Sequence, residues 1–153
     1  MGFPLALGFA AGEAEGAVAE GRAPAPTAYV TGDGSIGFYL AELNTMKRAG
    51  LFIIALVSND NKWGTEYNGQ KLVYGRTSNT ELGECDYAAV ANAFGVFGQV
   101  VEKREELKGA VEKALNMRGP ALIDVRVDPL GGAIRKVDPV LGMIIFEEVA
   151  KKL

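Results

Sequence analysis

The sequence predicts an α/β domain of three layers, in which a doubly wound and mostly parallel sheet carries helices on both faces. Segments with strand character alternate with segments of helical character along the chain. The segment 51–58, LFIIALVS, is apolar without alternation, as expected of a strand that is buried on both faces. The 153 residues are enough for one domain with one core, and we expect a single domain over residues 1–153.

The individual elements follow from local patterns. The first expected helix has a proline in its first turn and apolar residues spaced by three and four, and the helix at 85–95 has Asp86 as its N-cap. Residues 59–84 are polar and glycine-rich, and we expect a long functional or mobile connection there. The expected strands are residues 27–31, 51–58, 96–102 and 121–127, and the expected helices are residues 3–20, 35–50, 85–95, 103–117 and 143–153.

Composition excludes several classes of function. The net charge is −3, so basic residues do not outnumber acidic ones, and we expect no nucleic-acid partner. The longest apolar runs are too short or too interrupted to span a bilayer, and a secretory signal is missing, so we expect no membrane partner and a cytoplasmic location. The chain has no histidine and one cysteine, Cys85, which excludes histidine-based nucleophilic triads and metal sites made of several cysteines. Carboxylates or a bound cofactor must therefore carry any chemistry, and no catalytic side chain is assigned.

Acidic residues follow two consecutive strands of the predicted sheet. Asp33 lies in the sequence TGDGS after the first strand, and Asn59 and Asp60 lie in SNDNKWG after the second. Ligands of open parallel sheets bind beyond the carboxyl ends of the strands. If the two strands are neighbours, the oxygens of these residues can meet over one spot. The pattern therefore predicts a cation site at this edge.

The glycine-rich loop has two further interpretations. Residues 32–37 match the dinucleotide pattern G-x-G-x-x-G, with Asp60 at a suitable distance to hold a ribose hydroxyl. Alternatively, GDG and NDN are simple turns, since Asn, Asp and Gly dominate turns. An ionised Asp33 against a diphosphate is unfavourable unless a divalent cation lies between them, and Mg²⁺ binds one or two carboxylates together with phosphate oxygens. The cation interpretation explains Asp33, whereas the dinucleotide interpretation only tolerates it. The turn interpretation stays open, and the pairing of the two motifs across consecutive strands counts against it.

The stretch GDGSIGFYLAELNTMKRAGLFIIALVSNDNKWG resembles the diphosphate-binding motif of thiamine diphosphate enzymes. It is most similar to the acetolactate synthase and 2-oxo acid decarboxylase branch, through its helix ELNTMKR. MGFPLALGFAAG, DYAAVANAFG and GPALIDVRVDP resemble further motifs of that family, so the resemblance extends to about residue 129. It implies the thiamine diphosphate-binding fold, with thiamine diphosphate and Mg²⁺ as cofactors.

The resemblance also implies the roles of individual residues. Asp60 departs from the family, which usually has Asn at this position, and adds a negative charge to the site. The implied metal ligands are the side chains of Asp33 and Asp60 and the backbone carbonyl of Lys62. The implied cofactor-binding residues are Gly34 and Ser35 at the diphosphate, Met1 against the bent cofactor, and Gly32, Trp63 and Gly64 beside them. Glu66 and Tyr67 are candidates to face the substrate.

The family builds its active site from two halves, and the half that binds the pyrimidine ring is absent from this sequence. The resemblance therefore implies a partner domain or subunit, a homo- or hetero-oligomer such as a dimer, and a chain that is inactive alone. The start at Met1 within a family motif favours a domain of a longer enzyme over the small subunit of a split decarboxylase. The expected activity is that of a lyase or transferase on a small 2-oxo acid, with decarboxylase, carboligase and acyl-CoA lyase reactions all compatible. A non-catalytic nucleotide-binding module and a domain retained only for assembly are the alternatives.

Overall fold

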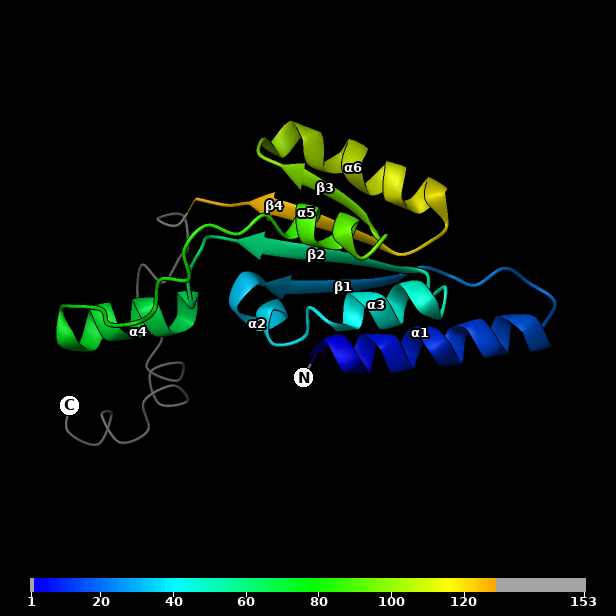
Figure 1. The fold of residues 1–153 in the computed structure, drawn as a ribbon, viewed down its shortest axis with the longest axis horizontal. Helices are drawn as coiled ribbons and strands as arrows, with labels where there is room; N and C mark the ends of the chain where they lie inside the picture. The colour runs from blue at the N-terminus through cyan, green and yellow to red at the C-terminus, as the bar shows by residue number, and fades with distance from the viewer. Residues whose placement is uncertain (1, 129–153) are drawn as a thin grey trace.

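The structure, a computed structural model, describes residues 2–128 and consists of a parallel sheet between two layers of helices (Figure 1). The strands are β1 (Thr27–Gly32), β2 (Ile53–Asn59), β3 (Phe97–Val101) and β4 (Ala121–Arg126). Their order is β1-β2-β4-β3, and each of the three pairs is parallel. The helices are α1 (Gly2–Ala19), α2 (Asp33–Gly37), α3 (Glu42–Arg48), α4 (Gly64–Tyr74), α5 (Tyr87–Ala93) and α6 (Arg104–Met117). The predicted fold class is confirmed.

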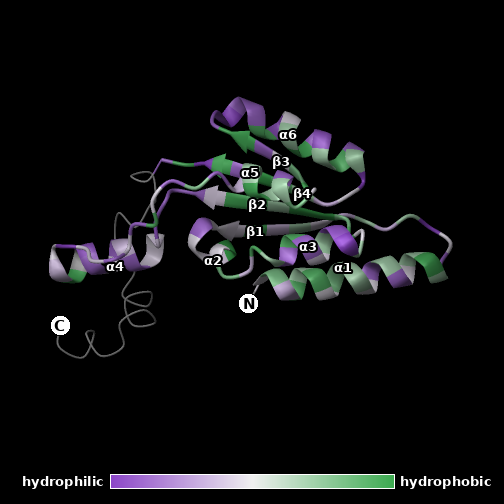
Figure 2. Ribbon diagram, viewed as in Figure 1, coloured by the Kyte–Doolittle hydropathy of each residue, from purple (hydrophilic) through white to green (hydrophobic). Residues whose placement is uncertain are grey.

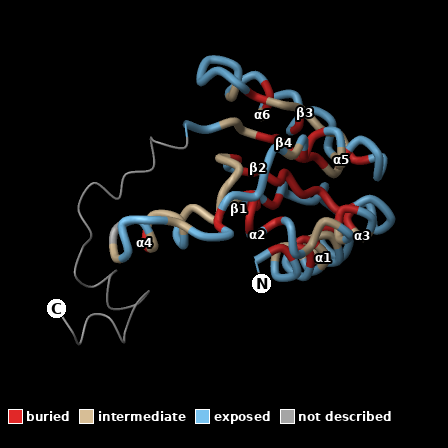
Figure 3. The backbone as a smooth tube through the Cα atoms, turned by 60° about the vertical axis from the view of Figure 1, so that its left-hand side comes forward, coloured by how far each residue is buried: buried red, intermediate tan, exposed pale blue. Residues whose placement is uncertain are grey.

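The central strand β2 is buried on both faces, as its continuous apolar sequence predicts. Ile53, Ala55 and Val57 contribute to a core cluster that contains residues of α1, α3 and α5. Ile54 belongs to a second cluster on the opposite face, where the small residues Ala110 and Ala114 of α6 approach the sheet. Figure 3 shows the buried chain concentrated in the sheet and on the inner sides of the helices. The two clusters explain the three layers.

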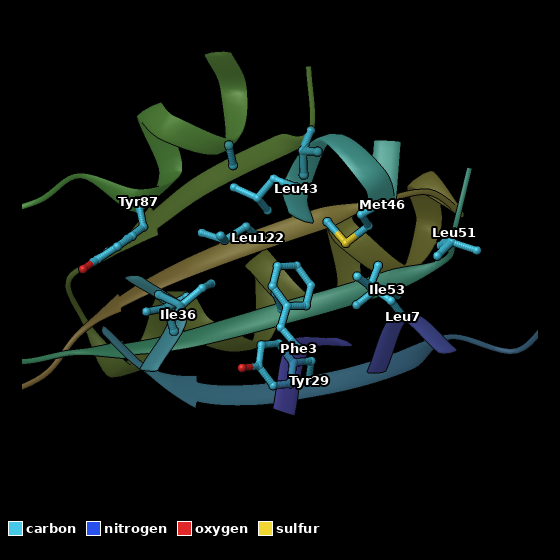
Figure 4. Close-up of a cluster of buried hydrophobic side chains, with 14 of the residues drawn as sticks. Phe3, Leu7, Tyr29, Ile36, Leu43, Met46, Leu51, Ile53, Tyr87 and Leu122 are labelled. Carbon is cyan, nitrogen blue, oxygen red and sulfur yellow. The ribbon is translucent and has the colours of Figure 1, made fainter. Parts of the chain in front are cut away.

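Helix α1 covers the β1 end of the sheet. Phe3 is fully buried, and its ring stacks on that of Tyr29 in β1 with a centroid distance of 5.0 Å. Figure 4 shows this pair beside Leu7, Ile53 and the residues of α3. The contact places the N-terminal end of α1 near the strand that leads into the glycine-rich loop.

The single helix expected over residues 35–50 is wrong, because the structure has two short helices in this region, α2 and α3. Gly34 and Gly37 lower the helix propensity of the first segment. The chain leaves α2 through an i→i−3 turn, in which the Tyr39 N–H donates to the Ile36 carbonyl at 2.8 Å. The change of direction allows Ile36 in α2 and Met46 in α3 to be fully buried in the same cluster. Core packing outweighs the continuous helical spacing of the sequence.

The segment 59–84 contains a helix that the sequence analysis missed. Helix α4 extends away from the carboxyl edge of the sheet, and Figure 2 shows no continuous apolar stripe along it. The chain then returns, since the Trp63 N–H donates to the Thr80 carbonyl at 2.8 Å. Gly75, with φ of +67°, closes α4 in the left-handed conformation that favours glycine, and is the sequence signal that identifies this end. Without an apolar face, hydrophobic periodicity cannot reveal α4.

The other elements agree with their expected positions to within two residues. The Asp86 N-cap is confirmed, because its carboxylate accepts a hydrogen bond from the Ala89 N–H at 2.8 Å. The helix expected at 143–153 lies outside the described residues. Among the helices of the described part, none is long and apolar enough to cross a bilayer.

The contact between α5 and β3 gives a stability prediction. A Cβ atom at Gly98 would lie 2.1 Å from the Ala88 carbonyl oxygen, whereas one at Gly109 on exposed α6 would meet nothing within 4 Å. We expect Gly98→Ala to lower the free energy of unfolding by about 1–3 kcal/mol, because helix and strand must separate. The control Gly109→Ala should raise it by about 0.5–1 kcal/mol through helix propensity. Urea unfolding of the full chain measures both, and a Gly98→Ala variant as stable as the parent would contradict the close packing.

Candidate functional site

The carboxyl ends of β1 and β2 lie side by side, because the parallel register aligns Gly32 with Ser58. The residues that follow these two positions therefore leave the sheet at the same edge. A cavity of about 350 Å³ opens there. Its walls come from both loops and from the start of α4: Gly32, Asp33, Gly34, Ser35, Ser58, Asp60, Trp63, Gly64, Thr65 and Glu66.

The structure brings together most of the residues that the sequence analysis assigned to the site. Lys62 contacts the site through its backbone N–H, and Met1 lies outside the described residues. Tyr67 does not line the cavity, and its ring lies under the Lys62 ammonium, with Nζ 4.1 Å from the centroid. Eight of the assigned residues line the cavity: Gly32, Asp33, Gly34, Ser35, Asp60, Trp63, Gly64 and Glu66.

Asp33 is the most constrained acid of the cavity. Its side chain is almost fully buried, and each carboxylate oxygen accepts one backbone N–H, Oδ1 from Gly34 at 2.9 Å and Oδ2 from Lys62 at 3.1 Å. Burial raises the pKa of Asp33 most, the Gly34 hydrogen bond opposes this, and the nearby charge of Asp60 raises the pKa further. Asp33 and Asp60 thus lie at one cavity, whose wall also includes Glu66, at an electrostatic cost that a divalent cation would remove.

Two glycines permit this close arrangement. A Cβ atom at Gly34 would lie 2.7 Å from Cε3 of the Trp63 ring, and one at Gly64 would lie 3.3 Å from Oδ2 of Asp60. The Trp63 ring also meets the Phe38 ring at 5.3 Å between centroids. Trp63 therefore forms an aromatic wall directly against the glycine-rich loop, and the Asp60 carboxylate lies beside Gly64, the residue that follows Trp63.

The side chains available in the cavity fit a magnesium ion bound with a phosphate ligand. In residues 2–128, no cluster of three or more Asp, Glu, Cys or His side chains forms a complete metal site. Two carboxylates leave most of an octahedral shell to backbone oxygens, water and ligand oxygens, which is how Mg²⁺ binds phosphorylated ligands. The exposed hydroxyl of Ser35 lies at the same cavity for such a ligand. A structural zinc site would require more nitrogen or sulfur ligands than these residues supply.

The expectation that Asn59 and Asp60 both direct oxygens at one spot is wrong for Asn59. Its side chain is buried, and its amide donates to Oδ1 of Asp124 at 3.0 Å and to the Cys85 carbonyl at 3.1 Å. Successive side chains at a strand end point to opposite faces, so only one of the two residues can face the cavity. Asp60 is that residue.

Asp124 of β4 was missed by the sequence analysis. It is fully buried in the strand ALIDVR, next to the apolar Ile123. An acid inside an otherwise apolar strand is a recognisable signal, because a buried charge requires hydrogen-bonding partners. Burial also raises the pKa of the Cys85 thiol, which favours the unreactive protonated form.

The family model described as thiamine pyrophosphate enzyme, C-terminal TPP binding domain, matches residues 1–125. The chain belongs to this family. TPP stands for thiamine diphosphate. Among the relatives of this TPP-binding domain, the acetolactate synthase of Bacillus subtilis is 35% identical over 99 residues. These residues make up 65% of this chain and 17% of that protein. The mitochondrial acetolactate synthase catalytic subunit of Saccharomyces cerevisiae is 31% identical over 144 residues, 94% of this chain and 19% of that protein.

A solved structure supports the same relationship. The benzoylformate decarboxylase of Polynucleobacter necessarius superposes with a TM-score of 0.72 and 26% identity, covering 82% of this chain and 23% of that protein. The TPP-binding domain spans about a fifth of the length of the curated relatives it matches. Its fold and its membership of the acetolactate synthase and decarboxylase branch thus agree with the resemblance found in the sequence.

The closeness of Asp33 and Asp60 gives a pH-dependent prediction for the stability of the TPP-binding domain without metal. Asp60→Asn removes a charge that raises the pKa of Asp33. A carboxyl whose pKa is raised on folding contributes stability that is complete below its ordinary pKa of about 3.9 and is lost as pH rises through the raised value. We therefore expect the variant to be more stable than the parent by on the order of 1 kcal/mol at about pH 7, with a smaller gain at about pH 4.

Urea unfolding with a chelator at a series of pH values measures this gain. Glu112→Gln, on the exposed surface of α6, is the matched control that removes one negative charge far from the cavity. If the free energy of unfolding of Asp60→Asn exceeds that of the parent by the same amount at every pH, the repulsion between Asp33 and Asp60 would be contradicted.

Proposed function

We propose that this chain binds Mg²⁺ and the diphosphate of thiamine diphosphate, as one half of a 2-oxo acid decarboxylase or carboligase of acetolactate synthase type. The observation that carries the proposal is the pairing of Asp33 and Asp60 at one cavity, beside a glycine-rich loop. An anionic ligand in that cavity requires a cation between its oxygens and the two carboxylates. The family match and the acetolactate synthase relatives support the choice of cofactor and of reaction class.

The chain's own residues anchor the cofactor in this proposal. The carboxylates of Asp33 and Asp60 and the carbonyl of Lys62 hold the ion. Gly34 and Ser35 bind the diphosphate, and Trp63 covers the loop from the other side. Bound thiamine diphosphate supplies the electron sink that breaks the carbon–carbon bond beside a keto group. The protein's part in this half is therefore orientation and charge neutralisation, and no side chain of the chain acts as acid or base.

A pyrimidine-binding domain or subunit is the proposed partner. Leu5 and Phe9 of α1 are 73% and 71% exposed, and Phe38, whose ring meets that of Trp63, is 71% exposed, so apolar side chains are exposed on α1 and beside Trp63. Exposed apolar groups of this size mark interaction surfaces. The relatives are about five to six times as long as the matched region, which leaves room in them for further domains. The proposed assembly is a homo- or hetero-oligomer in the cytoplasm.

Cofactor binding is testable through Trp63, the only tryptophan of the chain. Titration of the full chain with thiamine diphosphate in the presence of Mg²⁺ should change the Trp63 fluorescence, because the ring contacts the glycine-rich loop. Asp33→Ala should weaken binding by about 100-fold or more, since it removes the buried metal ligand. Glu112→Gln should bind as the parent does.

Two outcomes would contradict cofactor binding by this site. A signal with NAD that does not require Mg²⁺ would favour the nucleotide-binding alternative. Unchanged binding of thiamine diphosphate by Asp33→Ala would place the ligand elsewhere and would support a domain retained for assembly.

The requirement for a partner is tested by turnover of a 2-oxo acid. The full chain of 153 residues with Mg²⁺ and thiamine diphosphate should release no CO₂ from pyruvate or benzoylformate, because residues 1–125 match the TPP-binding domain and we expect a different domain to bind the pyrimidine ring. Addition of a candidate pyrimidine-domain protein should start turnover. Full activity of the chain alone would contradict the division of the active site.

A further inference from the structure

Asp124 lies outside the cavity and yet connects the two loops that form it. It stands in β4 opposite Val57 of β2, and its side chain is completely buried. It is not among the residues that line the cavity, so it does not touch a ligand there. A buried carboxylate is costly, and its contacts must account for its presence.

Both oxygens of Asp124 are used by different elements. Oδ1 accepts the Asn59 side-chain amide from the end of β2 at 3.0 Å, and Oδ2 accepts the Tyr87 backbone N–H from the start of α5 at 3.0 Å. The Arg126 guanidinium lies 3.1 Å from Oδ2. All three partners are donors, so the carboxylate satisfies each of them. Asp124 thereby ties β4 to β2 and to α5 at the edge that carries the cavity.

The contact with Asn59 determines the course of the second loop. Because Nδ2 of Asn59 points at Asp124, its Oδ1 is directed the other way and accepts the Asn61 backbone N–H at 3.2 Å. Asn61 is held at φ of +59°, a conformation that costs energy for a residue other than glycine. The turn presents the next residue, Lys62, whose N–H donates to Oδ2 of Asp33. The chain of contacts runs from Asp124 to the buried acid of the cavity.

The contact with Tyr87 reaches the first loop. Tyr87 is buried, and its hydroxyl lies 3.3 Å from the backbone carbonyl of Asp33 and donates to it. Burial raises the pKa of the Tyr87 phenol, so the hydroxyl keeps its proton and remains a donor at neutral pH. Since Asp124 holds the Tyr87 backbone, it positions this hydroxyl as well. Both loops are thus fixed to the same carboxylate.

We propose that Asp124 is a positioning residue for the metal and diphosphate site, which holds the Asp33 and Asp60 loops at the spacing the ion requires. The inference rests on the proposed function for the identity of the ligand. Partners of metal ligands fix the geometry of the ligands they contact, and loss of such a partner weakens metal binding. Asp124→Asn keeps the shape of the side chain, but it replaces one carboxylate oxygen with an NH₂ group. That group would face a donor that now binds Asp124. One of the two loops must then lose its contact.

The first test needs no cofactor. Hydrogen exchange in the full chain, without metal, reports the backbone N–H groups of Gly34, Asn61 and Lys62, which make the hydrogen bonds of the two loops. We expect exchange at these groups to be about tenfold faster in Asp124→Asn. Ile123→Val, in the same strand but directed at the opposite face, is the control for simple loss of stability and should leave these groups unchanged relative to the rest of the chain. Equal exchange at these groups in Asp124→Asn and the parent would overturn the proposal.

The second test measures affinity through Trp63 fluorescence. The dissociation constant for thiamine diphosphate at saturating Mg²⁺ should rise about tenfold in Asp124→Asn and stay within about twofold of the parent in Ile123→Val. An unchanged affinity in Asp124→Asn would overturn the positioning role. If the parent itself fails to bind while the exchange result holds, the proposed ligand is wrong and the positioning of the loops stands.

Tyr87→Phe keeps the proposal testable should Asp124→Asn not fold. It removes only the hydroxyl that reaches the Asp33 carbonyl and retains the buried ring. We expect faster exchange at Gly34 and Lys62 and an affinity about threefold weaker, with the exchange of β3 and β4 unchanged. Parent-like exchange at Gly34 and Lys62 in this variant would overturn the connection through Tyr87.

Discussion

The parallel pairing of β1 with β2 is the constraint on which the rest of the site depends. Parallel strands end at the same edge, so the loops that follow Gly32 and Asn59 leave the sheet side by side. One loop carries Asp33 to the cavity and the other carries Asp60, so both loops are needed to pair these two acids. The sheet holds this spacing because β2 is buried on both faces, between α1 and α3 on one side and α6 on the other. A shift in register by one residue would direct Asn59 at the cavity and bury Asp60, since neighbouring side chains point to opposite faces.

The site is arranged at the expense of the stability of the domain without ligand. Asp33 is buried beside a second carboxylate, and its pKa is raised by both effects. Gly34 has no side chain, which allows the Trp63 ring to lie against the first loop. Gly64 likewise leaves room for the carboxylate of Asp60. Such strained and charged arrangements are typical of binding sites, where the ligand repays the cost on binding. The Asp60 of this chain, in the place where the resembling family usually has Asn, makes that cost larger and the attraction for a cation stronger.

Two polar systems of different character meet at this edge. The acids of the cavity lie on its wall, whereas Asp124 and Asn59 do not line it and pair with polar groups inside the protein. The closed network links β4, β2 and α5, and its outer contacts end at the backbone of Asp33 and Asn61. A buried, fully satisfied network of this kind gives a fold a unique local geometry, because any other arrangement leaves a charge without partners.

The sequence by itself determined the layered α/β architecture, because a strand as apolar as LFIIALVS can be buried only between helices, and the Asp86 cap and the glycine-rich loop follow from local chemistry. It also determined most of the residues that meet at the cavity, since both motifs stand at strand ends. Only the tertiary structure decided that residues 33–48 form two helices, because burial of Ile36 and Met46 in one core outweighs helical spacing. The polar helix α4 likewise has no periodic signal. The direction of Asn59 and the partners of Asp124 depend on β4 and α5, which are distant in sequence, and no local pattern records a contact between residues 65 positions apart.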